Sequence, residues 1–175
     1  MQKIFEQAQR IKLVIFDVDG VLTDGTLFLG DDGQEYKAFN SKDGFGMKLL
    51  LKSGIDIGII TARTSDVVKI RMKSLGIKYV FQGQQQKAAA YESLRDDLGL
   101  TNEQIAYVGD DVVDLPVMQQ VGLAITVQDG HPLVKQQAHW QTQQPGGRGA
   151  AREVCELIMQ AQGTLEHAFG QFTGQ

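Results

Sequence analysis

The sequence predicts an α/β fold: a Rossmann-like parallel sheet flanked by helices, with a small β-hairpin insertion and no large cap domain. Short apolar runs alternate with helical patterns along the 175 residues, and this alternation is typical of βα units that form a parallel sheet. One pair of runs around a glycine-containing turn interrupts the alternation. At about fourteen residues, this insertion is too short to fold as an independent cap.

The expected strands and helices follow one another in a regular order. The apolar runs expected to be strands are 13–16, 55–60, 79–81, 105–108 and 123–125. The segments with helical patterns are 42–52, 65–75, 87–98, 115–120 and 150–160. Pro116 suits the first turn of a helix, where its missing N–H has no intrahelical partner.

The interruption covers residues 26–39, where 26–29 and 34–39 flank Gly30-Asp31-Asp32-Gly33 and predict a β-hairpin. Asp31 and Asp32 are expected to serve the turn. The whole chain, 1–175, is expected to form one domain of ordinary size. Residues 163–175 are expected to be a flexible tail.

Composition excludes several classes of protein. Hydrophobic residues make up 42% of the chain and charged residues 22%, which is typical of globular domains and unlike disordered chains. The apolar runs are too short to span a bilayer, and the net charge of -4 gives no general attraction to nucleic acid. The N-terminus lacks a secretory signal, and Cys155 is the only cysteine, so we expect a cytoplasmic protein without disulfides.

The first expected strand ends in two carboxylates, Asp17 and Asp19, which are two residues apart. In an extended chain such side chains point to the same side. Later strand ends supply other groups: Thr61 and Arg63 follow the second run, Lys87 opens the helix after the third, and Asp110 and Asp111 follow the fourth. Because ligands bind beyond the carboxyl ends of parallel strands, we expect these groups to converge.

Together these groups predict hydrolysis of a phosphate monoester. Asp17 is the expected nucleophile, which forms an aspartyl-phosphate, and Asp19 is the expected proton donor and then the base that activates water. Thr61 and Lys87 are expected to hold the phosphate oxygens and to stabilise the charge of the transition state.

A divalent cation is also expected, because a carboxylate nucleophile and a phosphate dianion repel each other. Mg²⁺ fits, since it binds a few carboxylates together with substrate oxygens. The expected ligands are Asp17, the main-chain carbonyl of Asp19, and Asp110. Asp111 and Asp114 are expected to support the site by orienting water or Lys87.

These motifs resemble those of a known superfamily. Asp17-Val18-Asp19-Gly20-Val21, Thr61, Lys87 and Gly109-Asp110-Asp111 are similar, in this order, to the four motifs of the haloacid dehalogenase superfamily of phosphatases. Over roughly residues 10–162 the chain resembles the 3-deoxy-D-manno-octulosonate 8-phosphate phosphatase family, on the segments 40–46, 60–63, 82–84, 107–111 and 146–150.

This resemblance implies a capless enzyme that releases orthophosphate from 3-deoxy-D-manno-octulosonate 8-phosphate during lipopolysaccharide precursor synthesis. It also implies a homotetramer assembled through the hairpins, in which the C-terminal tail closes over an adjacent site. Arg63 and the segment Lys42-Asp43-Gly44 would lie near the substrate, and Arg148, in a glycine-rich loop, is a candidate for binding a sugar carboxylate.

Structural alternatives stay open for several of these residues. Asp114 is also suited to capping the helix of Pro116, and Arg63 to a surface ion pair. Lys42 and Asp43 fit an ordinary helix N-terminus, and Arg148 fits a structural loop. The three histidines, His131, His139 and His167, lack a metal-binding spacing, and structural roles are expected for them and for Cys155.

Three other functions remain as alternatives. A sialic- or KDN-type 9-phosphate phosphatase would use the same catalytic groups. A phosphoacceptor signalling domain also combines acids, Thr and Lys on a parallel sheet, but in a different order along the chain. A non-catalytic oligomerisation module is disfavoured by the intact motifs.

Overall fold

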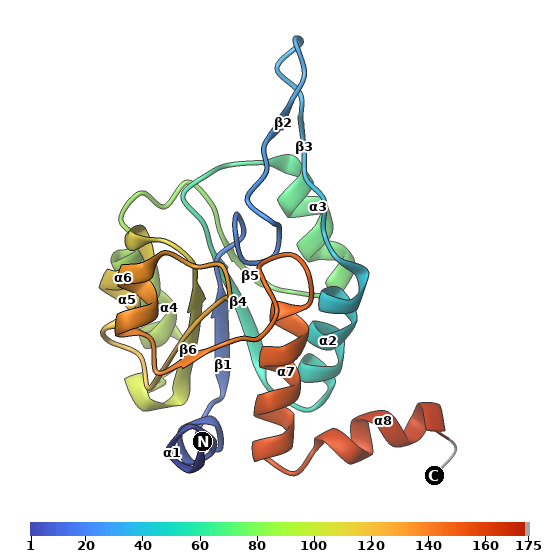
Figure 1. Ribbon diagram of the computed structural model, residues 1–175, viewed down its shortest axis with the longest axis vertical. Coiled ribbons are helices and arrows are strands. Elements are labelled where there is room, and N and C mark those ends of the chain that lie inside the picture. The colour runs from blue at the N-terminus through green and yellow to red at the C-terminus, as the bar shows by residue number, and fades with distance from the viewer. Residues whose placement is uncertain (174–175) are drawn as a thin grey trace.

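The computed structural model describes residues 1–173 and confirms the α/β architecture (Figure 1). The strands of its main sheet are β1 (Leu13–Phe16), β4 (Asp56–Ile60), β5 (Tyr79–Phe81), β6 (Ile105–Gly109), β7 (Leu123–Thr126) and β8 (Trp140–Gln141). They lie in the order β5-β4-β1-β6-β7-β8, and all neighbouring pairs are parallel. The chain therefore extends the sheet from β1 first in one direction and then in the other. This switch point is where ligands bind in such sheets.

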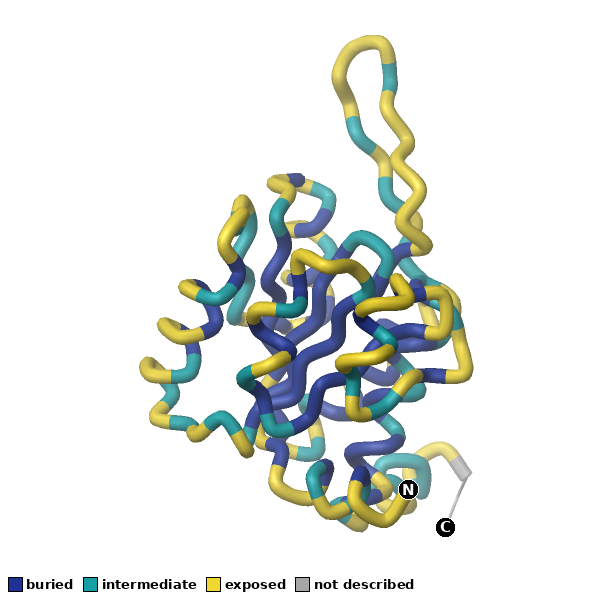
Figure 2. The backbone as a smooth tube through the Cα atoms, turned by 60° about the vertical axis from the view of Figure 1, so that its left-hand side comes forward, coloured by how far each residue is buried: buried dark blue, intermediate teal, exposed yellow. Residues whose placement is uncertain are grey.

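Strand β1 is apolar throughout because both of its faces are covered. Val14 and Phe16 belong to a core on one face, whereas Leu13 and Ile15 belong to a second core on the other. All four side chains are fully buried, and burying each contributes roughly 1.5–3 kcal/mol. Figure 2 shows the buried strands between the more exposed helices.

Two groups of helices cover the sheet (Figure 1). The first core is formed with α2 (Ser41–Lys52), α3 (Asp66–Leu75) and α7 (Ala150–Ala161), and the second with α4 (Lys87–Asp97), α5 (Leu115–Met118) and α6 (Pro132–Gln137). Local signals explain several boundaries. Asn40 caps α2 by accepting a hydrogen bond from the N–H of Lys42, Gly76 ends α3 in the left-handed conformation, and Pro116 lies in the first turn of α5.

The predicted hairpin projects from the body of the molecule (Figure 1). Its strands, β2 (Phe28–Leu29) and β3 (Glu35–Tyr36), are shorter than the expected 26–29 and 34–39. The turn is closed by a hydrogen bond of 2.8 Å from the N–H of Gly30 to the carbonyl of Gln34. The large apolar side chains of the hairpin, Leu27, Phe28, Leu29 and Tyr36, are exposed.

Some elements were not predicted: α1 (Gln2–Ala8), α6, β8, two short 3₁₀ helices (Asn102–Gln104 and Val112–Asp114), and α8 (Leu165–Thr173). Helix α5 ends at Met118 and is shorter than the expected 115–120. Helix α8 lies within the segment expected to be a flexible tail, whose residues 174–175 lie outside the described part of the chain. Contacts with distant residues stabilise α8: Phe172 packs edge-on against Phe45, and Arg152 lies over the ring of Phe169. Among the described residues, no helix combines the length and apolar character needed to cross a membrane.

Candidate active site

Three carboxylates converge where β1 and β6 end. One carboxylate oxygen from each of Asp17, Asp110 and Asp114 lies within 4.8 Å of the others, and we call these residues the acid cluster. The parallel pairing of β1 with β6 continues past Phe16, since the N–H of Asp17 donates to the carbonyl of Val108 at 3.0 Å. Neighbouring strands that end at one level therefore bring acids from distant parts of the sequence together.

Lys87, the first residue of α4, enters the acid cluster from the face of the sheet covered by α4. Its Nζ lies 2.7 Å from Asp17 Oδ2 and 2.7 Å from Asp114 Oδ1, and its side chain is only 1% exposed. The structure thus brings Asp17, Lys87 and Asp110 together, as their positions at strand ends predicted.

Asp114 organises the loop beyond β6. Its Oδ1 accepts hydrogen bonds from Lys87 and from the hydroxyl of Tyr107, both at 2.7 Å. Its Oδ2 accepts from the N–H groups of Asp110 at 3.0 Å and Asp111 at 3.2 Å. It makes no capping hydrogen bond to α5, so the alternative role as a cap of that helix is not observed. Tyr107 was missed in the sequence because it falls inside an apolar strand run.

The acid cluster is short of positive charge. Burial, followed by the negative charge of Asp114, raises the pKa of Asp17 to about 6, although Lys87 opposes this change. Burial and the neighbouring carboxylates raise the pKa of Asp110 to about 8. Burial alone would lower the pKa of Lys87, but Asp17 and Asp114 outweigh it and raise that pKa. The ammonium of Lys87 therefore has three carboxylates near it. These carboxylates stabilise the charged form of Lys87, but one positive charge does not neutralise three negative charges.

Glycine lets the loop after β1 approach β6. Gly20 has a φ of 86°, and a Cβ atom there would lie 2.1 Å from Asp110 Oδ2. Thr61 is buried just beyond β4, the other neighbour of β1, and its N–H donates to the carbonyl of Phe81 at 3.0 Å. The predicted hydroxyl is therefore held at the same end of the sheet as Asp17.

Asp19 lies in a different network, which we call the rim network: Asp19, Glu35, Lys37 and Arg63. Lys37 forms an ion pair with Asp19 and lies 3.4 Å from Glu35 Oε1. Arg63 Nη2 bonds Glu35 at 2.6 Å, and Arg63 Nε lies 4.0 Å from Asp19 Oδ2. The ion pair suggested as an alternative for Arg63 is thus present. Glu35 and Lys37 were not expected at the site, although their i, i+2 spacing indicates side chains on one side of a strand.

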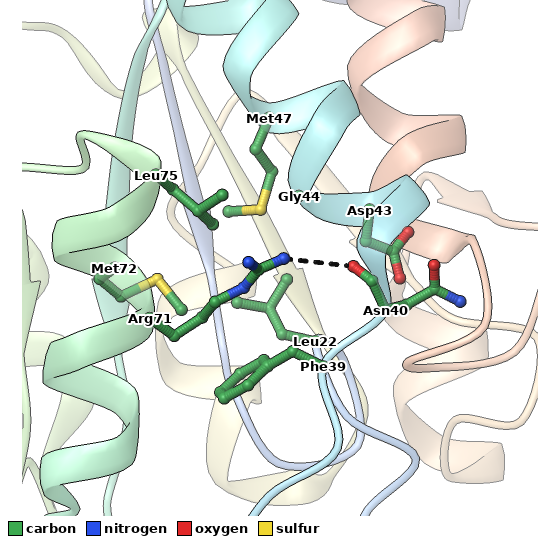
Figure 3. A pocket seen from close by; sticks show the side chains of 9 residues that line it. All are labelled: Leu22, Phe39, Asn40, Asp43, Gly44, Met47, Arg71, Met72 and Leu75. Carbon is green, nitrogen blue, oxygen red and sulfur yellow. Dashed lines mark hydrogen bonds between the residues drawn. The ribbon is translucent and has the colours of Figure 1, made fainter.

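The segment Lys42-Asp43-Gly44 opens α2 beside a small pocket (Figure 3). Lys42 is exposed, whereas Asp43 is buried, and its carboxylate accepts hydrogen bonds from the N–H groups of Arg152 at 2.8 Å and Gly149 at 3.2 Å. Asp43 therefore caps α7 from a neighbouring helix, and burial raises its pKa despite these bonds. At Gly44 a Cβ atom would lie 2.2 Å from Arg71 Nη2, so glycine leaves room for that guanidinium.

The glycine-rich loop before α7 packs directly on the loop after β1. A Cβ atom on Gly146 would lie 1.8 Å from the carbonyl oxygen of Gly20, and the N–H of Gly147 donates to the carbonyl of Val21 at 2.8 Å. Arg148 forms an ion pair of 3.1 Å with Asp24 at the surface. Asp111 is exposed and caps the short helix after β6 through the N–H of Val112 at 2.7 Å.

Comparison with known proteins identifies the family. Residues 79–153 match the model of the haloacid dehalogenase-like hydrolases. The 3-deoxy-D-manno-octulosonate 8-phosphate phosphatase KdsC of Yersinia pestis is 48% identical over 167 residues, which cover 95% of this chain and 89% of the relative. The chain belongs to the KdsC family of haloacid dehalogenase-like phosphatases.

Solved structures agree with this membership of the KdsC family. The crystal structure of the Yersinia pestis phosphatase has a TM-score of 0.93 at 48% identity, covering 94% of this chain and 89% of that one. The Moraxella catarrhalis phosphatase, in complex with magnesium ion, phosphate ion and a KDO molecule, has a TM-score of 0.96 at 41% identity, covering 98% and 99%. The fold with a hairpin and no large cap is therefore that of the family.

The residues of this KdsC-family chain fit a magnesium ion. Asp17 and Asp110 offer hard oxygen ligands within the acid cluster, while the oxygens of Asp114 are already used by Lys87, Tyr107 and two N–H groups. The raised pKa of Asp110 reflects a buried site with too many carboxylates for one lysine. A divalent cation would supply the missing charge.

Proposed function

We propose that this chain hydrolyses 3-deoxy-D-manno-octulosonate 8-phosphate to 3-deoxy-D-manno-octulosonate and orthophosphate in lipopolysaccharide precursor synthesis. The observation that carries the proposal is the meeting of Asp17, Lys87 and the partly buried Asp110 at one end of the sheet, in a chain 48% identical to a 3-deoxy-D-manno-octulosonate 8-phosphate phosphatase. The cluster supports phosphoryl transfer as the reaction, and the similarity to the relatives supports this sugar phosphate as the substrate.

In this proposal a carboxylate oxygen of Asp17 attacks phosphorus as the bond from phosphorus to the sugar oxygen breaks. Asp19 gives its proton to the departing sugar oxygen and then takes one from the water that attacks the aspartyl-phosphate. Lys87 and Thr61 hold the non-bridging oxygens and stabilise the charge that develops on them. Bound Mg²⁺, held by Asp17, the main-chain carbonyl of Asp19 and Asp110, would neutralise the repulsion between nucleophile and phosphate.

Several finer predictions belong to the same proposal. Residues 1–175 would act as one domain in the cytoplasm, where the buried, free Cys155 suits a reducing environment. Hairpins of neighbouring subunits would pair in a homotetramer, which is supported by the exposed Leu27, Phe28, Leu29 and Tyr36. The predicted contact of Arg63 with substrate is supported by its place in the rim network beside Asp19. Contacts of Lys42, Asp43, Gly44 and Arg148 with substrate, and a supporting role for Asp111, stay predictions.

The deciding experiment measures phosphate release from a panel of sugar phosphates with purified protein and Mg²⁺. We expect the eight-carbon 8-phosphate to give the highest kcat/KM, and an Asp17→Asn variant to fall by roughly 10⁴-fold or more while remaining folded. A preference for nine-carbon 9-phosphates would favour the sialic- or KDN-type alternative. Release of no more than one phosphate per chain would favour a phosphoacceptor domain.

A further inference from the structure

The hairpin contributes a buried lysine to the neighbourhood of the catalytic loop. Lys37 lies just after β3, and its side chain is only 1% exposed, although the hairpin around it is mostly exposed (Figure 2). Its ammonium contacts Asp19, with Glu35 3.4 Å away. A buried ammonium is retained only when it is well paired, so this contact is a defined feature of the fold and not an incidental surface ion pair.

The contact matters because Asp17 and Asp19 leave the end of β1 two residues apart. Both carboxylates are attracted to the same positive groups, Lys87 and a bound cation, because opposite charges attract strongly where water is excluded. In the structure they are separated. Asp17 Oδ2 lies 2.7 Å from Lys87, whereas Asp19 bonds Lys37 through Oδ1 and has Arg63 Nε 4.0 Å from Oδ2.

We propose that Lys37 is a positioning residue that holds the Asp19 carboxylate on the hairpin side of the site, apart from the acid cluster. The inference rests on the proposed role of Asp19 in proton transfer. Lys37 itself exchanges no proton with the substrate. Glu35 fixes Lys37 in turn, and Arg63 fixes Glu35 through its bond of 2.6 Å. The hairpin therefore organises the chemistry of its own chain.

A purely structural role would make different predictions. If Lys37 only anchors the hairpin, its loss lowers stability and slows hydrolysis of every ester alike. If it positions Asp19, its loss slows hydrolysis chiefly where the leaving oxygen needs a proton. Alkyl phosphates have such a leaving group, whereas p-nitrophenyl phosphate releases a stabilised phenolate and needs little protonation.

The test compares these two kinds of ester in Lys37→Met, which keeps the length of the side chain and removes its charge. We expect kcat/KM, which reports the first phosphoryl transfer, to fall about 10- to 100-fold for an alkyl phosphate and less than about 3-fold for p-nitrophenyl phosphate. Lys37→Arg should recover part of the loss. Lys73→Met, an exposed lysine on α3, is the matched control and should resemble the wild type.

A double-mutant cycle shows whether Lys37 acts through Asp19. In an Asp19→Asn background, Lys37→Met should cause no further loss on the alkyl ester, because there is no carboxylate proton donor left to position. Multiplicative losses, or equal losses on both esters, would overturn the proposal. Lys37→Gln, which keeps a hydrogen-bond donor, replaces Lys37→Met in both tests if the latter does not fold.

These outcomes are distinct from failure of the proposed function. The leaving-group comparison and the cycle are run with a simple alkyl phosphate, so they judge Lys37 whichever sugar is the natural substrate. A wild-type protein that hydrolyses simple alkyl esters but not the eight-carbon sugar phosphate would overturn the substrate assignment alone.

Discussion

The acid cluster and the rim network lie side by side, but the negative charges of their carboxylates are neutralised to different extents. The cluster groups Asp17, Asp110 and Asp114 around the single ammonium of Lys87. The rim network instead has two acids, Asp19 and Glu35, and two cations, Lys37 and Arg63. Their charges balance without any ligand.

The difference in charge balance would account for the different roles proposed for Asp17 and Asp19, which are separated by one residue. The cluster favours a divalent cation because it lacks positive charge, in agreement with the raised pKa of Asp110, and that cation would reduce the repulsion between the carboxylates and a phosphate. The balanced rim network keeps the Asp19 carboxylate paired with Lys37 and Arg63, apart from the proposed metal site. Experiments that alter the charge of the cluster should therefore have larger effects than experiments at the surface.

Removing Lys87, the cation that pairs with the acid cluster, should have the largest effect on stability. Lys87→Met leaves the buried carboxylates of Asp17 and Asp114 without their partner, and we expect the free energy of unfolding to fall by about 3–5 kcal/mol, together with loss of turnover. Urea unfolding monitored by circular dichroism measures the change, with Lys73→Met as the control. A variant as stable as the wild type would show that the acids do not depend on Lys87. It would contradict the difference in charge balance between the acid cluster and the rim network.

Adding a cation should stabilise the protein through the cluster. At Mg²⁺ one hundred times its dissociation constant, the free energy of unfolding should rise by about 2.7 kcal/mol, and chelation should reverse this and stop turnover. Asp110→Asn should abolish the stabilisation by Mg²⁺. Without Mg²⁺ it should be at least as stable as the wild type, because it removes a repelled carboxylate.

Asp111→Asn is the comparison variant for that experiment, since the exposed Asp111 carboxylate accepts hydrogen bonds from the N–H groups of Val112 and Asp114. It should keep the response to Mg²⁺ in thermal unfolding. A full response to Mg²⁺ retained in Asp110→Asn would place the metal outside the acid cluster.

Sequence alone predicted the fold and the acid cluster because both follow from local patterns. Each strand of 13–16, 79–81 and 105–108 is a run that is apolar on both faces, and parallel strands necessarily bring the groups at their carboxyl ends to one edge. The positions of Asp17, Lys87 and Asp110 at strand and helix boundaries were thus sufficient to predict that they meet.

The remaining features depend on contacts between distant segments. In the sequence Lys37 has the pattern of any hairpin residue, and only the folded structure shows its ion pair with Asp19. Tyr107 likewise has the pattern of a strand residue, and only the structure shows its hydrogen bond to Asp114. Helix α8 likewise depends on packing against Phe45 and Arg152. No local periodicity encodes these partners.

Asp43 has two candidate roles, capping of α7 and substrate binding, and its variants can distinguish them. Asp43→Ala leaves the N–H groups of Gly149 and Arg152 unpaired at the start of α7, so the free energy of unfolding should fall by about 1–2 kcal/mol. Asp43→Asn keeps an acceptor and should lose less. Steady-state kinetics separates the roles: an increase in KM with no loss of stability would indicate substrate binding in place of capping.

The smallest effect is expected at Arg148, which was a candidate for binding the sugar carboxylate. Its side chain is 68% exposed and its partner Asp24 is 33% exposed, so water screens their ion pair. Arg148→Ala should therefore change the free energy of unfolding by less than about 1 kcal/mol. Its kinetics test the candidate role, because loss of a carboxylate contact would raise KM for the sugar-acid phosphate but not for p-nitrophenyl phosphate. Equal KM changes for both esters would assign Arg148 to the loop that packs on the catalytic segment.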